Sequence, residues 1–477
     1  MTVHDGIRST CPRLAVWMLI VVAALANTLA APVSAQPIED PKTYAGDFWT
    51  RPRLTGDWGG FRDQLAARGI RLDVDVMSTP QGVASGGQDT GAEVLGNAEY
   101  TLNVDTGKVG LWPGGFLKVL GNTGFGANVV KDSGALSIVN TSAVIPSLSR
   151  TSTGLANATF MQFLSHKFGL VAGKVFTLDG FQGEFTGNYR TQFLNGAMIF
   201  PFAEALVPFS AFGGGVIALP WDGVVLSALA LDPSGTIMNS DLTQAFRDGV
   251  LGLASAQASI EPFGLVGHQS LTGMWSDKQH FSLSQDPSNL ARLLLLDKFP
   301  RLADPGPGLE RILERFYPGL VHHPVEPLNQ KSDTVAMFYS FDQYLWQPKD
   351  DPKRGIGVFF VFGASDGNPC PIQYTYTMGV GGNGVIPGRP DDNFGVGWAR
   401  VEISSDFVPF LRQRLHLGLD REDTVEMYYN MALTPWLSLT PDLQIINPSL
   451  GKTLGSDGRL HDVGTAVVAG LRIYSRF

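Results

Sequence analysis

Residues Ile70 to Ser78 read IRLDVDVMS, and their pattern predicts the architecture of the whole chain. Aliphatic and charged side chains alternate along it, with Leu72, Val74 and Val76 on one side and Arg71, Asp73 and Asp75 on the other. A repeat of two residues is the period of a β-strand, whose successive side chains point to opposite faces. The stretch therefore predicts a strand with one apolar and one charged face.

The same alternation recurs along most of the chain, for instance over 98–105, 334–342 and 424–431. We count about seventeen such runs, and because single-chain bacterial barrels use even numbers of strands we predict about sixteen. The last run ends the sequence at Phe477, with Arg472 and Arg476 on its polar face. A terminal phenylalanine on such a strand resembles the assembly signal of bacterial outer-membrane barrels.

Residues 1–35 are predicted to be a secretory signal peptide. Arg8 and Arg13 flank the start of an apolar run over 14–26, and Val33-Ser34-Ala35 has the small residues of a cleavage site. No later run reaches about 18 apolar residues, so only a closed barrel could span a bilayer. We expect cleavage near Ala35 and export to the outer membrane of a Gram-negative bacterium.

The composition excludes several functions. The formal net charge of −9 disfavours nucleic acid as a partner, because phosphate binding needs a basic surface. Two cysteines rule out a disulfide framework or a cysteine-rich metal site. His322 and His323 are adjacent, so on an extended chain they point in opposite directions and are poorly placed to share a metal ion. We therefore expect no metal, no cofactor and no enzymatic activity.

Two regions lack the strand alternation. Residues 36–69 form a segment ahead of the barrel, and Asp57 to Gly69 has the pattern of a short helix that ends at a glycine. Residues 284–326 contain two helix-like runs punctuated by prolines. Because so few residues bury little core, we interpret them as one long loop inserted into a barrel that spans 70–477. The N-terminal segment is expected to lie in the periplasm.

Five short motifs occur in a fixed order: LTGDWGGFR at 54–62, GLWPGG at 110–115, GRPDD at 388–392, EMYY at 426–429 and LTPW at 433–436. Together they resemble the carbohydrate-selective porin (OprB) family, over roughly 54–125 and 388–477. The resemblance implies an all-β, sixteen-stranded antiparallel barrel in the outer membrane. It also implies passive diffusion of small sugars such as glucose. Porins commonly form trimers, so a homotrimer is one expected assembly.

A sugar is neutral and rich in hydroxyl groups, so a selective pore needs paired polar side chains and an aromatic ring that bind it weakly. Five residues on polar stretches are predicted to line such a pore: Arg190, Trp398, Arg400, Glu402 and Gln444. The alternation puts Trp398, Arg400 and Glu402 on one strand face. The expected partners are mono- or disaccharides in the lumen and outer-membrane lipid around the barrel.

Two alternatives stay open at this point. A soluble periplasmic β-sandwich shows the same alternation, with its apolar faces turned inward rather than toward lipid. A general or anion-type pore would share the barrel, and an anion pore would line its constriction with Lys and Arg. The charges on the polar strand faces are of mixed sign, which favours a neutral solute.

Overall fold

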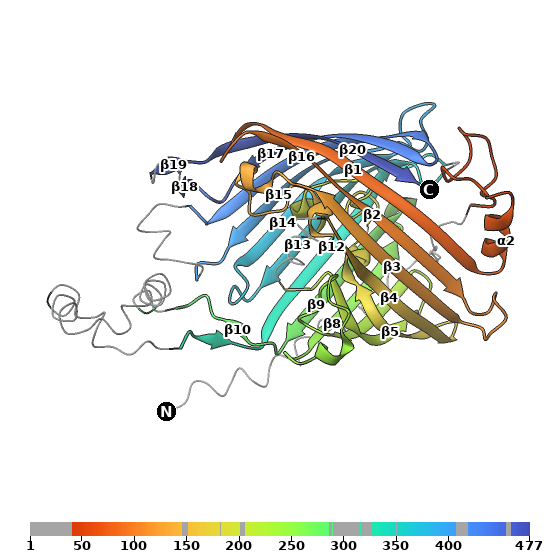
Figure 1. The fold of residues 1–477 in the computed structure, drawn as a ribbon, viewed down its shortest axis with the longest axis horizontal. Helices are drawn as coiled ribbons and strands as arrows, with labels where there is room; N and C mark the ends of the chain where they lie inside the picture. Colours follow the sequence, from red (N-terminus) through yellow and green to blue (C-terminus); the bar gives the residue numbers. More distant parts are fainter. Residues whose placement is uncertain are drawn as a thin grey trace.

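The computed structural model describes residues 41–145, 151–181, 183–200, 206–285, 289, 315, 327–349, 351–406, 418–454 and 459–477. Within them, 16 strands close into one antiparallel barrel, in which successive barrel strands pair and β1 pairs with β20 (Figure 1). Pairing the first strand with the last removes both edges of the sheet. The predicted fold class is confirmed.

The barrel strands are β1 Ile70–Gly87, β2 Gly91–Asp105, β3 Gly115–Gly126, β4 Ser152–Ser165, β5 Phe168–Phe176, β6 Ser210–Ala218, β7 Val224–Leu231, β8 Leu251–Ile260, β9 Gly267–Ser276, β12 Thr334–Trp346, β13 Gly355–Ser365, β14 Ile372–Asn383, β15 Asn393–Ile403, β16 Arg421–Thr434, β17 Leu437–Asn447 and β20 Gly464–Arg476. Two short hairpins outside the barrel wall are formed by β10 His280–Phe281 with β11 Gln330–Lys331, and by β18 Lys452–Leu454 with β19 Leu460–Asp462. In the part of the chain that the structure describes, the α-helices are α2 Phe61–Ala67, α3 Val130–Ser133 and α4 Gly196–Ile199, and the 3-10 turns are η1 Thr141–Val144, η2 Thr177–Phe181, η3 Leu242–Gln244 and η4 Pro262–Gly264.

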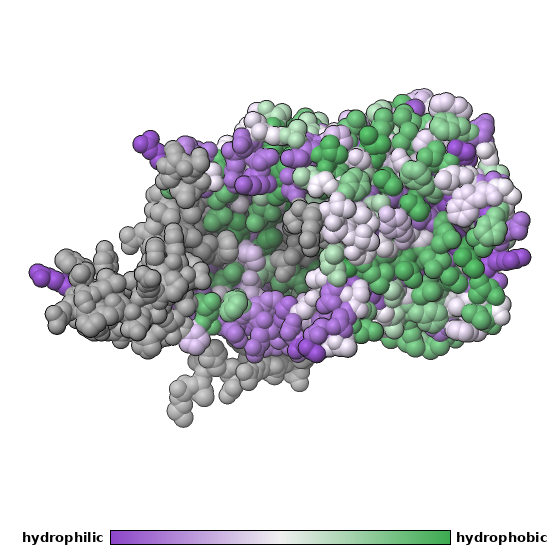
Figure 2. All heavy atoms as spheres, viewed as in Figure 1, coloured by the Kyte–Doolittle hydropathy of each residue, from purple (hydrophilic) through white to green (hydrophobic). Residues whose placement is uncertain are grey.

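The alternation seen in the sequence separates the two faces of the wall. On β1, Met77 is 0% exposed inside the barrel, whereas Leu72 on the other face is 43% exposed. The pairing of β1 with β2 is continuous from Ile70 opposite Val104 to Val83 opposite Gly91. Figure 2 shows apolar side chains over a broad part of the wall in this view. Outward apolar side chains are what a barrel presents to lipid.

The two ends of the barrel differ in the length of their connections. Two residues join β4 to β5 and two join β16 to β17, at the end where α2 and the C-terminus lie (Figure 1). At the other end, the connection from β9 to β12 covers 277–333 and includes β10 and β11. Outer-membrane barrels have short periplasmic turns and longer extracellular loops. We therefore call the end with α2 the periplasmic end and the other the extracellular end.

Two connections from the extracellular end fold back inside the barrel. One joins β3 to β4 and contains α3 and η1; the other joins β5 to β6 and contains η2 and α4. We call residues 183–200 of the second connection the inner segment. Its Phe193 and Met198 are 0% exposed and belong to one hydrophobic cluster with Phe359 of β13. The apolar core therefore lies inside the barrel, where it narrows the lumen.

The predicted short helix near the N-terminus is α2. It begins after Gly60, whose φ of 84° lies in the left-handed region that favours glycine. The predicted signal peptide and nearly all of the 284–326 insertion lie outside the described residues, so these boundaries stay predictions. Among the described residues, no helix has both the length and the apolar character needed to cross a bilayer.

Candidate functional site

An ion pair lies inside the barrel where the inner segment meets the wall. Arg190 Nε donates to Glu99 Oε2 at 2.7 Å, and the Tyr189 hydroxyl donates to Glu99 Oε1 at 2.5 Å. Glu99 is on β2, on the face that also carries the buried residues Leu95 and Asn97, and so it points inward. The Arg190 guanidinium also lies over the Tyr189 ring, 4.4 Å from its centroid.

At neutral pH Arg190 is charged and Tyr189 is neutral. Burial alone would lower the pKa of Arg190, but attraction to Glu99 outweighs burial and holds that pKa well above its ordinary value. Burial raises the pKa of Tyr189 well above its ordinary value, against the opposing effect of Arg190. The Arg190 side chain stays 18% exposed, while Glu99 is 2% exposed. Within this cluster, the Arg190 guanidinium is therefore the group that keeps part of its surface open to water in the lumen.

A glutamate of β16 holds the inner segment through its main chain. Glu426 accepts hydrogen bonds from the main-chain N–H groups of Leu194 at 2.5 Å and Asn195 at 3.1 Å. Glu422 likewise accepts from the N–H of Leu136, in the other inward connection, at 2.7 Å. A buried main-chain N–H group without an acceptor costs free energy, so each carboxyl group stabilises the connection that it binds. Both carboxylates are almost fully buried and serve to hold the two connections.

A buried arginine holds the same segment from β20. Arg472 donates to the carbonyl oxygens of Tyr189 at 3.0 Å and Gln192 at 2.8 Å, and to Thr440 Oγ1 at 3.2 Å. Its exposed fraction is 1%. The two carbonyl groups stand on either side of Arg190 in the sequence. Arg472 therefore fixes the backbone that carries Arg190 and acts as a positioning residue for it.

Gln444, predicted to line the pore, also faces inward but is 0% exposed. Its amide Nε2 donates to the carbonyl oxygen of Val139 and to Asp442 Oδ1, both at 2.9 Å. Its Oε1 accepts from Asn195 Nδ2 at 3.0 Å. Gln444 thus joins both inward connections to β17. Its amide oxygen and nitrogen are both hydrogen-bonded within the protein, so Gln444 does not line the open pore.

The other three predicted residues lie on the outward face of β15. Gly395 and Gly397 of this strand face Phe193 of the inner segment, so the alternate positions point away from the lumen. Arg400 forms an ion pair with Asp423 through Nε at 2.8 Å, and the indole N–H of Trp398 donates to the same carboxylate at 3.1 Å. The structure therefore brings Trp398 and Arg400 together, but outside the pore. Glu402 follows on the same face.

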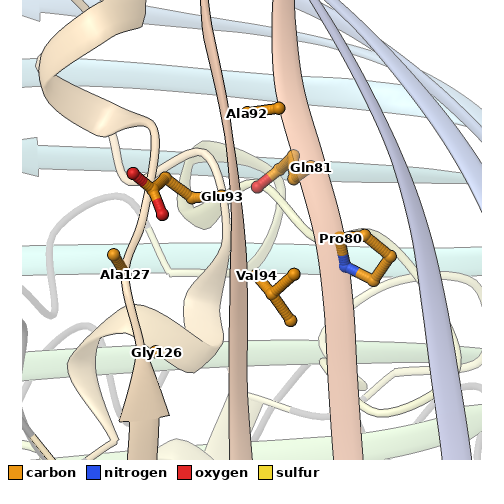
Figure 3. A pocket seen from close by; sticks show the side chains of 7 residues that line it. All are labelled: Pro80, Gln81, Ala92, Glu93, Val94, Gly126 and Ala127. Carbon is orange, nitrogen blue, oxygen red and sulfur yellow. The ribbon is translucent and has the colours of Figure 1, made fainter.

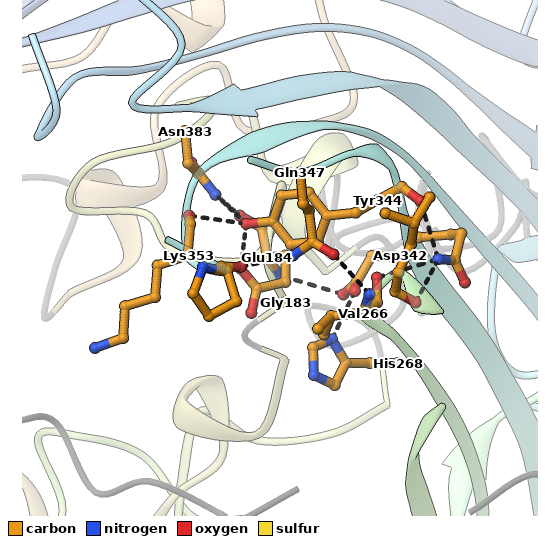
Figure 4. Close-up of polar contacts among 12 residues, drawn as sticks. Gly183, Glu184, Val266, His268, Asp342, Tyr344, Gln347, Lys353 and Asn383 are labelled. Atoms are coloured by element: carbon orange, nitrogen blue, oxygen red, sulfur yellow. Dashed lines mark hydrogen bonds and ion pairs between the residues drawn. The ribbon is translucent and has the colours of Figure 1, made fainter. Parts of the chain in front are cut away.

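A second polar cluster surrounds Glu184, near the start of the inner segment (Figure 4). Asp342 Oδ1 is 2.7 Å from His268 Nδ1, and Asp342 Oδ2 accepts from the main-chain N–H of Glu184 at 3.2 Å. The Tyr344 hydroxyl donates to Glu184 Oε2 at 3.1 Å, and Asn383 Nδ2 donates to the Tyr344 hydroxyl oxygen at 3.0 Å. Burial, followed by repulsion from Asp342, raises the pKa of Glu184. This cluster ties the start of the inner segment to β9, β12 and β14.

A shallow hollow of about 450 Å³ also marks the wall (Figure 3). It is lined by Pro80, Gln81, Ala92, Glu93, Val94, Gly126 and Ala127. Val94 is 50% exposed and lies on the face of β2 opposite Leu95. The hollow therefore belongs to the outer surface and does not form part of the lumen.

Sequence reasoning identifies Arg190 but misses its partners Glu99 and Tyr189. The alternation on β2 assigns Glu99 to a polar face together with Thr101 and Asn103, and the residue types do not separate them. Glu99 differs from these neighbours only because the inner segment returns into the barrel and brings Tyr189 and Arg190 to it. Gly395 and Gly397 do give a local signal of the inward face of β15, because small residues on one face leave room for a segment that folds into the barrel.

The sequence of this chain is similar to those of known porins. The family model of the carbohydrate-selective porin, OprB family matches residues 89–477. Porin B of Pseudomonas aeruginosa is 28% identical over 142 residues, which are 27% of this chain and 29% of that protein. The chain thus matches less than a third of the length of Porin B. The putative porin QuiX of Acinetobacter baylyi is 22% identical over 93% of this chain and 98% of that protein.

Solved structures share the fold. The high-pH structure of Pseudomonas putida OprB superposes with a TM-score of 0.72, at 19% sequence identity, over 91% of this chain and 100% of that chain. The prediction of an outer-membrane porin rather than an enzyme is confirmed by the family match. Because that match extends over far more than half of the chain, the protein belongs to the carbohydrate-selective porin, OprB family.

Proposed function

We propose that this porin lets small neutral sugars such as glucose diffuse passively through a constriction beside Arg190, Glu99 and Tyr189. The observation that carries the proposal is the ion pair between Arg190 and Glu99, whose arginine keeps 18% of its side chain exposed inside the barrel. The exposed part of the guanidinium can donate to the hydroxyl groups of a sugar, while Glu99 and Tyr189 hold the charge in place. Gln444 contributes by holding the segment that carries Arg190.

The arrangement favours weak binding of a sugar that moves through the pore over tight binding of a sugar that stays. Arg190 is already paired, so a sugar exchanges hydrogen bonds with the pair instead of filling an empty charged site. Binding in a conducting pore must be weak enough for the solute to leave. The inner segment is fixed by Glu426 and Arg472, which keeps the passage narrow and constant in shape. These contacts favour diffusion down a gradient without energy coupling.

Mixed charge also distinguishes this proposal from an anion pore. Near Arg190, Lys118 of β3 donates to Asp179 Oδ2 at 2.5 Å, so this cation is paired with a carboxylate too. An anion pore would instead line its constriction with cations that lack such partners. A general pore, selective by size alone, would pass glucose and a glycol of the same size at equal rates.

The test is solute entry into liposomes that contain the refolded protein. Glucose, a disaccharide and a neutral glycol of glucose-like size are compared, and then repeated with Arg190→Ala. We expect glucose to enter faster than the glycol in the wild type, and the ratio of the two rates to fall in the variant. Equal rates in the wild type would leave a general pore. Faster entry of a small anion than of glucose would support the anion-type pore.

The remaining proposals concern processing and assembly. We propose cleavage near Ala35, which leaves residues 36–69 in the periplasm, and a homotrimer in the outer membrane. The position of α2 at the end with short turns supports the periplasmic placement. N-terminal sequencing of the mature protein tests the cleavage site, and native mass spectrometry in detergent tests the trimer. A monomer in detergent would contradict the trimer.

A further inference from the structure

A second carboxylate stands next to Glu99 on the lumen wall. In the pairing of β1 with β2, Asp75 lies directly opposite Glu99. Both are on inward faces, because Met77 on β1 and Asn97 on β2 share those faces and are 0% exposed. Side chains directly opposite each other in an antiparallel pair lie about 4.5–5.5 Å apart at Cβ, and two like charges there repel. Each of these carboxylates therefore needs a cation.

The two cations come from different segments, and neither segment is part of the barrel wall. Glu99 is paired with Arg190 of the inner segment, which enters from the extracellular end. Asp75 is paired with Arg53, which lies ahead of α2 at the periplasmic end. Arg53 Nη2 is also 3.3 Å from Asp73 Oδ1, one inward position nearer the periplasm. Two arginine–carboxylate pairs thus stand side by side on one wall.

Arg53 is held in place by its neighbours in the N-terminal segment. The N–H of Leu54 donates to the carbonyl oxygen of Arg476 on β20 at 2.7 Å. Arg62 Nη2 donates to Asp73 Oδ1 at 2.8 Å and to the carbonyl oxygen of Phe477 at 3.0 Å. The N-terminal segment is therefore hydrogen-bonded to both β1 and the end of β20, at the periplasmic end of the barrel. From there Arg53 contacts Asp73 and Asp75 on the inward face of β1.

The state of this second pair resembles that of the first. The Arg53 side chain is 18% exposed and that of Asp75 is 14% exposed, so both reach water in part. Burial alone would lower the pKa of Arg53, but attraction to Asp75 and Asp73 outweighs burial and raises it. Arg53 is therefore charged at neutral pH. Its guanidinium supplies several N–H donors next to carboxylate acceptors, as Arg190 does.

We propose that Arg53 and Asp75 form a second sugar-contacting station, beside the Arg190–Glu99 pair and on its periplasmic side. A sugar that leaves the first pair meets the same donor and acceptor chemistry on the neighbouring strand, so its hydroxyl groups exchange partners without returning to bulk water. This inference rests on the proposed function and makes Arg53 a specificity-determining residue supplied from outside the barrel wall.

The experiment compares the ratio of glucose entry to glycol entry, in liposomes, for the wild type and four variants. Arg53→Ala removes the donors, Arg53→Lys keeps the charge without the planar fork, and Asp75→Asn removes the acceptor charge. Lys108→Ala is the matched control, because Lys108 is an exposed cation of the β2–β3 turn at the same end. Folding of each variant is checked by its heat-modifiable mobility in detergent gels, and ion selectivity by reversal potential.

We expect the glucose-to-glycol ratio to fall by about twofold or more in Arg53→Ala, which corresponds to the loss of roughly one hydrogen bond. The ratio should also fall in Arg53→Lys and Asp75→Asn, and stay unchanged in Lys108→Ala. An unchanged ratio in folded Arg53→Ala, while the wild type prefers glucose, would overturn the second station and leave the proposed function intact. No preference in the wild type would overturn the proposed function itself. Full retention in Arg53→Lys, with loss in Arg53→Ala, would assign the effect to charge and overturn a hydrogen-bonding station.

Discussion

Two parts of the lumen wall use similar polar side chains for different ends. On β1 and β2, Asp75 and Glu99 pair with arginine side chains that stay 18% exposed. On β16 and β17, Glu426 and Gln444 are 0% exposed and bond to groups of the inward connections. We call these the open wall and the holding wall. A carboxyl group that binds main-chain N–H groups only holds the fold, whereas an arginine that pairs with a wall carboxylate keeps part of its guanidinium on a surface that solutes can reach.

The largest expected effect comes from breaking the holding wall. Glu426→Ala leaves the buried N–H groups of Leu194 and Asn195 without their acceptor, at a cost of about 1–3 kcal/mol for each unsatisfied group. We expect the inner segment to loosen, the single-channel conductance in planar bilayers to rise, and the preference for glucose to fall. Glu402→Ala is the matched control, since it removes the same group from the outward face of β15 and should leave conductance unchanged. Equal conductance in both variants would show that the inner segment is held without Glu426.

A smaller effect is expected from Arg472→Met, which keeps a long apolar stem but removes the donors to Tyr189 and Gln192. Each lost hydrogen bond of this kind is worth about 1–3 kcal/mol, because the donor is charged and buried. Since those carbonyl groups frame Arg190, the glucose-to-glycol ratio should fall more than the barrel stability does. Arg476→Met, two inward positions further along β20, serves as the control. A loss of stability without a change in the ratio would contradict a positioning role.

The second polar cluster predicts a modest dependence on pH. Burial and repulsion from Asp342 raise the pKa of Glu184 above its ordinary value of 4.5 in the folded protein. A carboxyl group with a raised pKa contributes stability that is complete below the unfolded pKa and is lost as the pH rises through the folded pKa. As the pH rises above the ordinary Glu pKa of 4.5, the thermal midpoint of the wild type should therefore drop by more than that of Glu184→Gln. Parallel curves for the two proteins would refute this role of Glu184.

The smallest effect is expected on the outward face. In the ion pair of Arg400 with Asp423 the side chains are 31% and 21% exposed, and pairs of this kind contribute about 0–1 kcal/mol. Arg400→Ala should therefore change stability little and leave the glucose-to-glycol ratio unchanged, in contrast to Arg190→Ala. A fall in the ratio as large as that of Arg190→Ala would show that this face of β15 is in contact with the solute.

The fold could be predicted from the sequence because its signal is local. Alternation over a few residues identifies a strand and its two faces, and the count of such runs leads to a barrel of about sixteen strands. The candidate site could be predicted only in part. Arg190 stands out as a cation in a polar stretch, but its partner lies 91 positions away along the chain. Arg53 has no local signal for a role in the lumen, because it belongs to a segment outside the barrel.

The two faces of β15 show where local information ends. Alternation correctly puts Trp398, Arg400 and Glu402 on one face, yet it does not say which face turns inward. Polar side chains suggested the lumen, but the inner segment fills that space with Phe193 and Met198 and is accommodated by Gly395 and Gly397. Local patterns along the chain are enough to predict the strands, the closed barrel and the family. Which polar groups stay exposed in the lumen cannot be predicted from them, because two connections return inside the barrel and bury some wall residues while they leave others exposed.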